Sequence, residues 1–326
     1  MSLATQPNSC MIKSFILLVI IALFSNSTAE AQQTDTTHLN KDSIERAVDE
    51  FLKMIDSAEA PKSYVQVSIG IGNNQFSLKN VALNSQQSSF NLSLSPTVSY
   101  IHKSGFGITY NNYISLSKGG SEIIQHSITP SFDYQTSKDV QFGFSFTKYF
   151  GRKTNSNYTT PYENDFFSYF TYTKSKYQPG LSIGYSTGSF NETFFFPLIN
   201  RYDTATIGVK DFSFIPSVQR DITLKGLGKN DYFNFNPSAL FIFASSKYEV
   251  EASDRLILTR PRLAQRIRND FSSNTKFNLQ SLGLNLDATW YISKFFINPQ
   301  VYFDYYLLSS TNKLNVLYTV QTGFLF

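Results

Sequence analysis

The sequence is nearly free of cysteine and poor in histidine. Its single cysteine is Cys10, and only three histidines occur in 326 residues. A chain whose mature part has no cysteine forms neither a disulfide framework nor a thiolate metal site. No two histidines share a predicted face, and no aspartate-rich segment has EF-hand spacing. The sequence therefore predicts no metal site and no cofactor.

Charge and long apolar runs are scarce as well. Charged residues make up 16% of the chain, and the formal net charge of +4 is spread out, which does not favour nucleic-acid binding. One apolar run, residues 15–24, follows Lys13 and precedes an Ala-Glu-Ala tripeptide at 29–31. This order predicts a signal peptide over residues 1–31, because a membrane-spanning helix needs about twenty apolar residues. With no second such run, the pattern excludes a helical membrane protein and favours a bacterial envelope protein.

Aromatic residues, by contrast, are abundant. The 31 Phe and 20 Tyr alternate with Ser, Thr, Asn and Gln, a pattern that predicts strands. From Tyr64 onward we identify twelve alternating runs, near 64–72, 90–102, 106–117, 122–135, 140–150, 165–174, 179–190, 206–219, 231–245, 276–291, 295–308 and 313–326.

These runs predict an all-β fold, an antiparallel transmembrane β-barrel of about 12 strands over residues 63–326. Many runs are longer than the strands of a soluble sandwich, and one face is polar throughout. Short turns are expected at one end and longer loops at the other, as in outer-membrane barrels. The short turns are 103–105, 136–139, 175–178 and 292–294, and the long loops are 73–89, 151–164, 191–205 and 246–275. This arrangement places both termini in the periplasm.

Residues 32–62 precede the barrel as a periplasmic tether with a short amphipathic helix. Apolar residues recur at helical spacing over 40–57, and Pro61 ends the pattern. Three roles stay open for this helix: it plugs the barrel, docks an envelope partner, or rests against the sheet.

A proline recurs within the predicted strands. The segments LSPTVSY (94–100), ITPSFDY (128–134), IPSVQR (215–220), FNPSALF (235–241) and INPQVYF (297–303) share it. This unit resembles hairpins of the small outer-membrane barrels of Bacteroidetes-type bacteria, within the porin-like and OmpA-OmpX-like superfamily. Ile215 and Arg220 depart from the pattern. Since proline has no N–H for the sheet ladder, we expect a bulge or a local gap in pairing at each one.

The C-terminal strand ends in an aromatic residue. Tyr318, Val320, Phe324 and Phe326 share one face, and Phe326 is the last residue. This ending resembles the signal that the outer-membrane assembly machinery recognises in Gram-negative barrels. The resemblance implies that machinery as a partner during biogenesis.

The predicted lumen face carries acidic and phenolic side chains. Asp133, Asp287 and Asp304 lie there with Tyr302 and Tyr306. In a narrow pore these carboxylates would favour cations. A hydrogen-bonded interior that fills the barrel is the alternative, since small barrels are often filled.

One predicted loop is rich in arginine. Within 246–275 the arginines are Arg255, Arg260, Arg262, Arg266 and Arg268, and residues 262–271 have the pattern of a short amphipathic helix. Folded inward they would form an anion-attracting constriction, and folded outward they would contact lipopolysaccharide phosphates. Lys148 would suit the same phosphates. A solvated basic loop is the third interpretation.

No catalytic group emerges from the sequence. His126 is predicted on the lipid face, where outer-membrane phospholipases of twelve strands carry a serine–histidine–asparagine site. Those enzymes resemble this chain only in strand count. Here Ser127 points inward and Ile128 shares the histidine's face, so the nucleophile is missing. We therefore predict a non-enzyme. It is either a narrow channel for small polar solutes or ions, or a non-conducting structural or partner-binding barrel of an envelope assembly.

Overall fold

The computed structural model describes residues 62–73, 92–117, 120–134, 139–151, 160, 162–196, 201–225, 231–252, 262, 265, 273–307 and 314–326. Contacts divide the chain into Met1–Ala60 and Pro61–Phe326, and every described residue belongs to the second unit. The predicted signal peptide and the predicted helix over 40–57 lie outside the described residues. None of the described segments is a helix long and apolar enough to cross a membrane.

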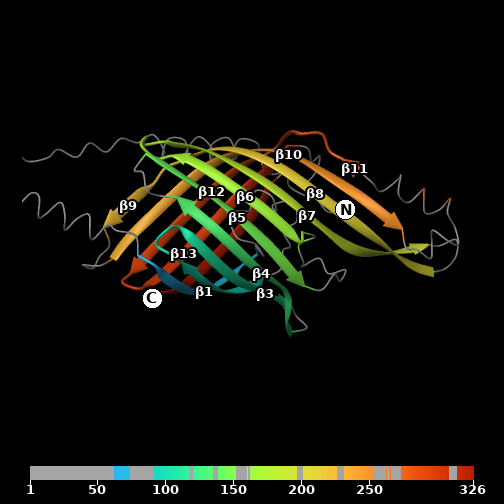
Figure 1. The fold of residues 1–326 in the computed structure, drawn as a ribbon, viewed down its shortest axis with the longest axis horizontal. Coiled ribbons are helices and arrows are strands. Elements are labelled where there is room, and N and C mark those ends of the chain that lie inside the picture. Colours follow the sequence, from blue (N-terminus) through green and yellow to red (C-terminus); the bar gives the residue numbers. More distant parts are fainter. Residues whose placement is uncertain are drawn as a thin grey trace, which may run out of the picture. The chain divides into compact units, whose positions relative to one another are not determined.

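Twelve long antiparallel strands close into a barrel, as the sequence predicts (Figure 1). They are β1 (Tyr64–Gly72), β2 (Ser93–Ile101), β3 (Phe106–Ser117), β4 (Gly120–Tyr134), β5 (Val140–Gly151), β6 (Asn164–Tyr172), β7 (Gln178–Phe196), β8 (Arg201–Gln219), β10 (Asp231–Ala252), β12 (Asn278–Ile292), β13 (Phe295–Tyr306) and β14 (Leu314–Leu325). The short strands β9 (Ile222–Lys225) and β11 (Ser273–Asn274) pair with β10. Pairing of β1 with β14, and of β8 with β10, completes the ring.

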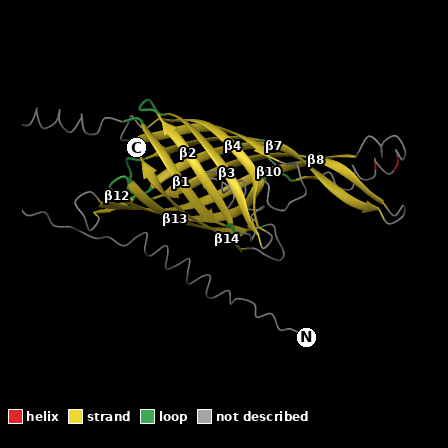
Figure 2. Ribbon diagram, turned by 90° about the horizontal axis from the view of Figure 1, so that it is seen from below, coloured by secondary structure: helices red, strands yellow, loops and turns green. Residues whose placement is uncertain are grey.

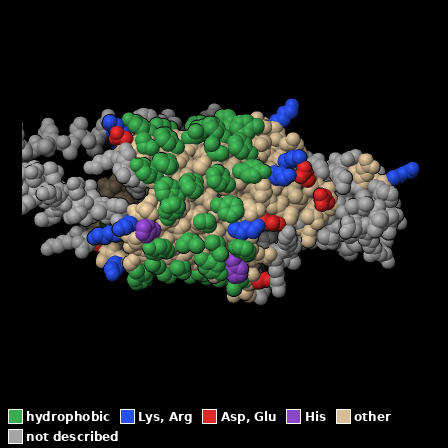
Figure 3. Space-filling view, in the orientation of Figure 1, with side chains coloured by type: hydrophobic (Ala, Val, Ile, Leu, Met, Phe, Trp, Pro, Cys, Tyr) green, Lys and Arg blue, Asp and Glu red, His purple; other side chains and the backbone are tan. Residues whose placement is uncertain are grey.

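Alternation along each strand separates an apolar exterior from a polar interior. On β5, Phe142, Phe144 and Phe146 are 38–48% exposed, whereas the intervening Thr147 is 5% exposed. On the face seen in Figure 3, apolar side chains cover the middle, and most basic and acidic side chains lie toward the two ends. Successive strand residues point to opposite faces, so one pattern builds both surfaces.

The prolines produce gaps in pairing and not bulges. Pro130 keeps its register with Ile108 on β3, whereas β4 and β5 skip residues 129 and 130 and resume in the same register. The same arrangement, with one neighbour paired and the other skipped, holds at Pro96, Pro216, Pro237 and Pro299. The register shifts occur elsewhere, between Tyr113 and Ile114 and between Ile242 and Phe243. A missing N–H thus removes one ladder contact without shifting the strand.

Two predicted loops are partly wrong. The range 191–205 is mostly strand, because β7 and β8 pair from Gln178↔Gln219 out to Phe196↔Arg201. β10 runs to Ala252, so the predicted loop 246–275 begins inside a strand. The last pair of β3 with β4 is Ser117↔Gly120, so only two residues separate these strands at the end where the loops were expected to be long. Beyond Asn164↔Thr187, the last pair of β6 with β7, strands β7, β8 and β10 continue as an extension of the barrel (Figure 2).

The seam between β1 and β14 is tight. Val65 and Phe326 exchange two backbone hydrogen bonds of 3.0 and 2.8 Å. A Cβ atom at Gly323 would lie 2.4 Å from the carbonyl oxygen of Val67 and 2.8 Å from the Cα of Ser68. Such contacts with backbone cannot relax by side-chain rotation. Closure therefore depends on a residue without a side chain at position 323.

We predict that Gly323→Ala weakens barrel closure by about 1–3 kcal/mol, the usual cost of overpacking. The measurement is the urea midpoint at which the folded protein in detergent loses its fast mobility on an unboiled gel. Gly208→Ala is the control, since its Cβ would meet its nearest atom at 3.6 Å. Equal midpoints for the two variants would contradict a tight seam.

Candidate functional site

Five aspartates lie at inward positions of the barrel wall. Asp133, Asp287 and Asp304 were predicted there, and the structure adds Asp165 on β6 and Asp211 on β8. Among the strand residues with described side chains, Lys148, Lys210 and Lys247 are the basic ones. All three alternate in phase with exposed phenylalanines and so project outward. The described part of the lumen is therefore lined by carboxylates without lysine or arginine.

Two of the aspartates belong to one polar row across five strands. In register order the row is Thr147, Asp165, Ser186, Asp211 and Ser246, on β5, β6, β7, β8 and β10. Asp165 and Ser186 are 2% and 0% exposed, and the Ser186 hydroxyl donates a 2.9 Å hydrogen bond to Asp165 Oδ1. Neighbouring strands are about 4.8 Å apart, so the two carboxylates flank the serine within about 10 Å.

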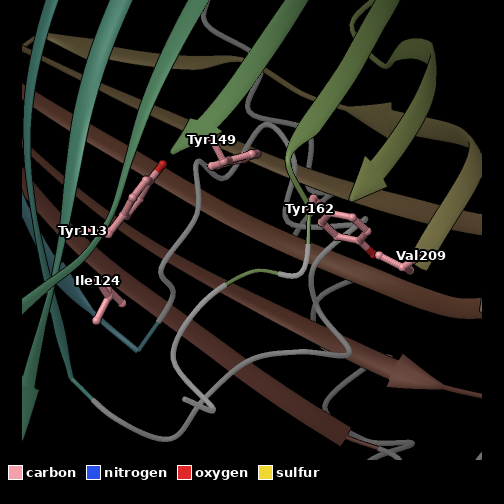
Figure 4. Packing of buried hydrophobic residues seen from close by; sticks show 5 residues of the cluster. All are labelled: Tyr113, Ile124, Tyr149, Tyr162 and Val209. Carbon is pink, nitrogen blue, oxygen red and sulfur yellow. The ribbon is translucent and has the colours of Figure 1, made fainter. Parts of the chain in front are cut away.

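Tyr162 covers this row from the segment before β6. Its side chain is 2% exposed, and its hydroxyl donates a hydrogen bond to Asp211 Oδ2. Burial, followed by the nearby Asp211 carboxylate, raises the pKa of Tyr162 well above its ordinary value. The phenol therefore stays protonated and keeps donating. Tyr162 packs with Val209, Tyr149, Tyr113 and Ile124 in one buried cluster (Figure 4).

One oxygen of Asp211 has no hydrogen-bond partner among the described residues. This oxygen is Oδ1. The hydroxyl of Ser213, the next inward residue of β8, is also buried without a hydrogen-bond partner among the described residues. Both side chains are more than nine-tenths buried. A buried carboxylate oxygen without a donor is costly, so this position favours a cationic or hydrogen-bonding ligand.

A tyrosine bridges strands near the opposite end of the lumen. Asp133, Gly143 and Tyr169 are in register on β4, β5 and β6, and the Tyr169 hydroxyl donates a 2.7 Å hydrogen bond to Asp133 Oδ1. A Cβ at Gly143 would lie 2.6 Å from both Asp133 Oδ1 and Tyr169 Cε1. The glycine thus leaves the space through which the tyrosine reaches the carboxylate.

The two remaining aspartates lie on β12 and β13. Asp287 accepts hydrogen bonds from Asn298, at 3.3 Å to each oxygen, and from Gln300. Asp304 is 0% exposed, and Tyr306 lies two residues further along the same face of β13.

Apolar side chains also enter the lumen. Tyr302, predicted as a lumen residue, is 1% exposed and packs with Ile215, Ile242 and Leu317, each at most 2% exposed. A Cβ at Gly283 on β12 would lie 2.5 Å from the Tyr302 hydroxyl, so the ring lies across that strand. This cluster narrows the interior beside the carboxylates.

Other predicted residues lie apart from the lumen. His126 faces outward, and its Nδ1 contacts Asn112 Oδ1 and the Tyr110 hydroxyl, the latter at 3.0 Å. Its register neighbours are Asn112 and Phe150, and neither is a nucleophile of the serine type. Arg262 is exposed and helical, while Arg255, Arg260, Arg266 and Arg268 lie outside the described residues. The arginine constriction and the absence of a lipid hydrolase site therefore stay predictions.

The residues of the predicted assembly signal face outward. Tyr318, Val320 and Phe324 are 42–49% exposed, and Phe326 is 65% exposed. Among the described residues, no group of three or more His, Cys, Asp or Glu side chains is arranged to hold a metal ion.

Sequence reasoning missed Asp165 and Asp211 for different reasons. Asp165 is the second residue of β6, where the sequence pattern does not separate strand from loop. Asp211 shares its face with Val209 and Ile215, which made the inward face of that run resemble an apolar one. The alternation of Phe212 and Phe214 with Asp211 was the available signal.

No protein-family model and no curated protein sequence matches this chain. The similar solved structures include LpxR from Salmonella typhimurium, with 8% identity and a TM-score of 0.34 over 79% of this chain and 99% of that one. They also include the translocator domain of the autotransporter NalP from Neisseria meningitidis, with 8% identity and a TM-score of 0.27 over 87% and 97%. An anion-selective porin from Comamonas acidovorans has 6% identity and a TM-score of 0.21 over 81% and 97%. With TM-scores this low, no activity is transferred to this chain.

We predict that Tyr162→Phe lowers the free energy of unfolding by about 1–3 kcal/mol, because it removes the phenol that donates to Oδ2 of the buried Asp211. Urea unfolding in detergent at pH 7 measures the change. Tyr185→Phe, at an outward position that is 46% exposed, is the control and should change stability by less than about 0.5 kcal/mol.

The effect of Tyr162→Phe on the free energy of unfolding should also depend on pH. The folded state raises the pKa of Tyr162, so it holds the phenolic proton more tightly than the unfolded chain does. The resulting contribution to stability is complete below the unfolded tyrosine pKa of about 10. It is lost as pH rises further toward the pKa of the folded state. The phenylalanine variant has no such group to titrate. The stability difference between the two proteins should therefore narrow above about pH 10. A constant or growing difference would contradict the assignment.

Proposed function

We propose that this chain is an integral outer-membrane barrel whose lumen is a narrow passage for small cations. The observation that carries the proposal is the set of five inward aspartates, with no inward lysine or arginine among the described strand side chains. Carboxylates along a narrow pore lower the energy of a cation and raise that of an anion. The unpartnered oxygen of Asp211 adds a position where a cation would be favoured.

The outer-membrane location rests on the chain's own surface. Apolar and aromatic side chains form the middle of the exterior, with charged groups toward both ends (Figure 3). A water-soluble protein rarely exposes so large an apolar surface. The predicted signal peptide and the aromatic C-terminus support the same location, with both termini in the periplasm. The proline-containing hairpins support a place among Bacteroidetes-type barrels.

A non-conducting barrel is the second candidate, and a specific observation favours it. The side chains of Tyr302, Ile215, Ile242 and Leu317 are almost completely buried within the barrel. A packed interior would make the barrel a structural or partner-binding component of an envelope assembly. Its predicted partner site, residues 40–57, lies outside the described residues.

We predict cation-selective conductance steps when the folded protein is inserted into planar bilayers. Single-channel recording in a salt gradient gives the selectivity from the reversal potential. Two unit charges 4 Å apart in water interact by about 1 kcal/mol, so each neutralised carboxylate should lower the cation permeability, and raise the anion permeability, by up to about fivefold each. The test variant is Asp165→Asn combined with Asp211→Asn.

Asp139→Asn is the control for this experiment. Asp139 lies in an exposed turn and forms a 3.6 Å ion pair with Lys174, so its loss should leave selectivity unchanged. An unchanged reversal potential in the double variant would contradict the cation passage. The absence of any conductance from well-folded protein would favour the non-conducting barrel.

A further inference from the structure

A row of lysines crosses the outer face of the barrel over five adjacent strands. In register order it consists of Lys148, Asn164, Thr187, Lys210 and Lys247, on β5, β6, β7, β8 and β10. We call it the lysine row. Lys148 Nζ donates a 2.9 Å hydrogen bond to Asn164, whose amide lies 3.4 Å from the Thr187 hydroxyl. Strand register thus places three cationic side chains in one row across the outer wall, and because barrel strands are tilted by about 35–45° this row is inclined to the membrane plane.

An aromatic row lies one outward step nearer the short-turn end. It consists of Phe146, Phe166, Tyr185 and Phe212, which are in register on β5 to β8 and 38–46% exposed. Aromatic residues at this position are typical of the border between the hydrocarbon and the headgroups in outer-membrane barrels. The lysine row follows this aromatic row toward the loop end of the barrel, the end at which we expect the headgroups of the outer leaflet.

The lysines have weak partners that a stronger anion would replace. Lys148 lies 4.0 Å from Glu163, and Glu249 lies 3.4 Å from Lys210 and 2.6 Å from Lys247. These side chains are 34–52% exposed, and exposed ion pairs of this kind contribute little to stability. Lys210 and Lys247 are direct register partners, an unfavourable like-charge pair that an additional anion would relieve.

We propose that the lysine row binds the phosphate groups of outer-leaflet lipid. The proposal rests on the outer-membrane location proposed above and not on conduction. Lys210 and Lys247 form one site on adjacent strands, and Lys148 lies three strands away, about 14 Å. A lipid headgroup with two separated phosphates spans such a distance, whereas its acyl chains lie against the aromatic row. Charge-assisted hydrogen bonds from lysine to phosphate hold the headgroup.

The test uses the full chain folded in detergent and lipid A carrying both phosphates as the probe. Binding is measured by thermophoresis, with dephosphorylated lipid A and inorganic phosphate in parallel. The proposal expects tight binding of phosphorylated lipid A, at least about tenfold weaker binding of the dephosphorylated form, and no competition by millimolar inorganic phosphate. Equal binding of both lipids, or displacement by inorganic phosphate, would overturn it.

The decisive variant changes Lys148, Lys210 and Lys247 to Gln together. A lysine near an anionic surface contributes about fivefold in affinity, so the triple variant should bind about a hundredfold more weakly. Arginine at the same three positions should restore binding. The matched control changes Lys103, Lys174 and Lys294, at the opposite end of the barrel, to Gln and should bind normally. Wild-type affinity in the triple variant, or an equal loss in the control, would refute the site.

Glu249→Gln provides a variant with the opposite expectation. It removes the carboxylate between two lysines, so phosphate binding should tighten, and weaker binding would count against the proposal. Each variant must keep the fast mobility of unboiled folded protein, which separates loss of the site from loss of the barrel. Absence of conductance would refute the passage proposed above while leaving lipid binding intact.

Discussion

Every backbone N–H and C=O in the wall of this protein must find its partner on a neighbouring strand, and closure of the ring is what makes this possible. An open sheet in lipid would leave two edges of unsatisfied groups, each costing several kcal/mol. The chain ends meet this constraint directly, because β1 and β14 pair along seven register positions and Val65 bonds with the C-terminal Phe326. The prolines are tolerated because each leaves a short gap on one side and keeps its register on the other.

Closure also decides where charge lies. With the strands locked in register, alternation places Asp165 and Asp211 inside the barrel and Lys148, Lys210 and Lys247 outside, in the adjacent register row. The two rows do not neutralise each other, because the sheet lies between them. Acidic side chains are therefore found in the lumen and lysines on the outer face, and both proposals rest on this separation.

The sequence predicted the barrel, its strand number and most strand positions, because alternation of large aromatic and small polar residues is strong wherever one face meets lipid. The sequence prediction failed where β7 and β8 extend past the neighbouring strands. The sequence of 191–205 does not alternate between apolar and polar residues, so its strands appear only in the pairing of β7 with β8. For the lumen, alternation placed Asp133, Asp287 and Asp304 inward. The contact of Tyr162 with Asp211 joins residues 49 positions apart and depends on folded geometry that no local pattern contains.

The most direct test of the closed ring is a disulfide across the seam. Ile71 and Val320 are register partners on β1 and β14, and the sequence has no cysteine other than Cys10 near the N-terminus. Cysteines at 71 and 320 should cross-link readily in the membrane-inserted protein, because paired strand residues lie within disulfide reach. Cysteines at 71 and 324, about 13 Å out of register, should not. Failure of the first pair, or equal cross-linking of both, would contradict the closed barrel in this register.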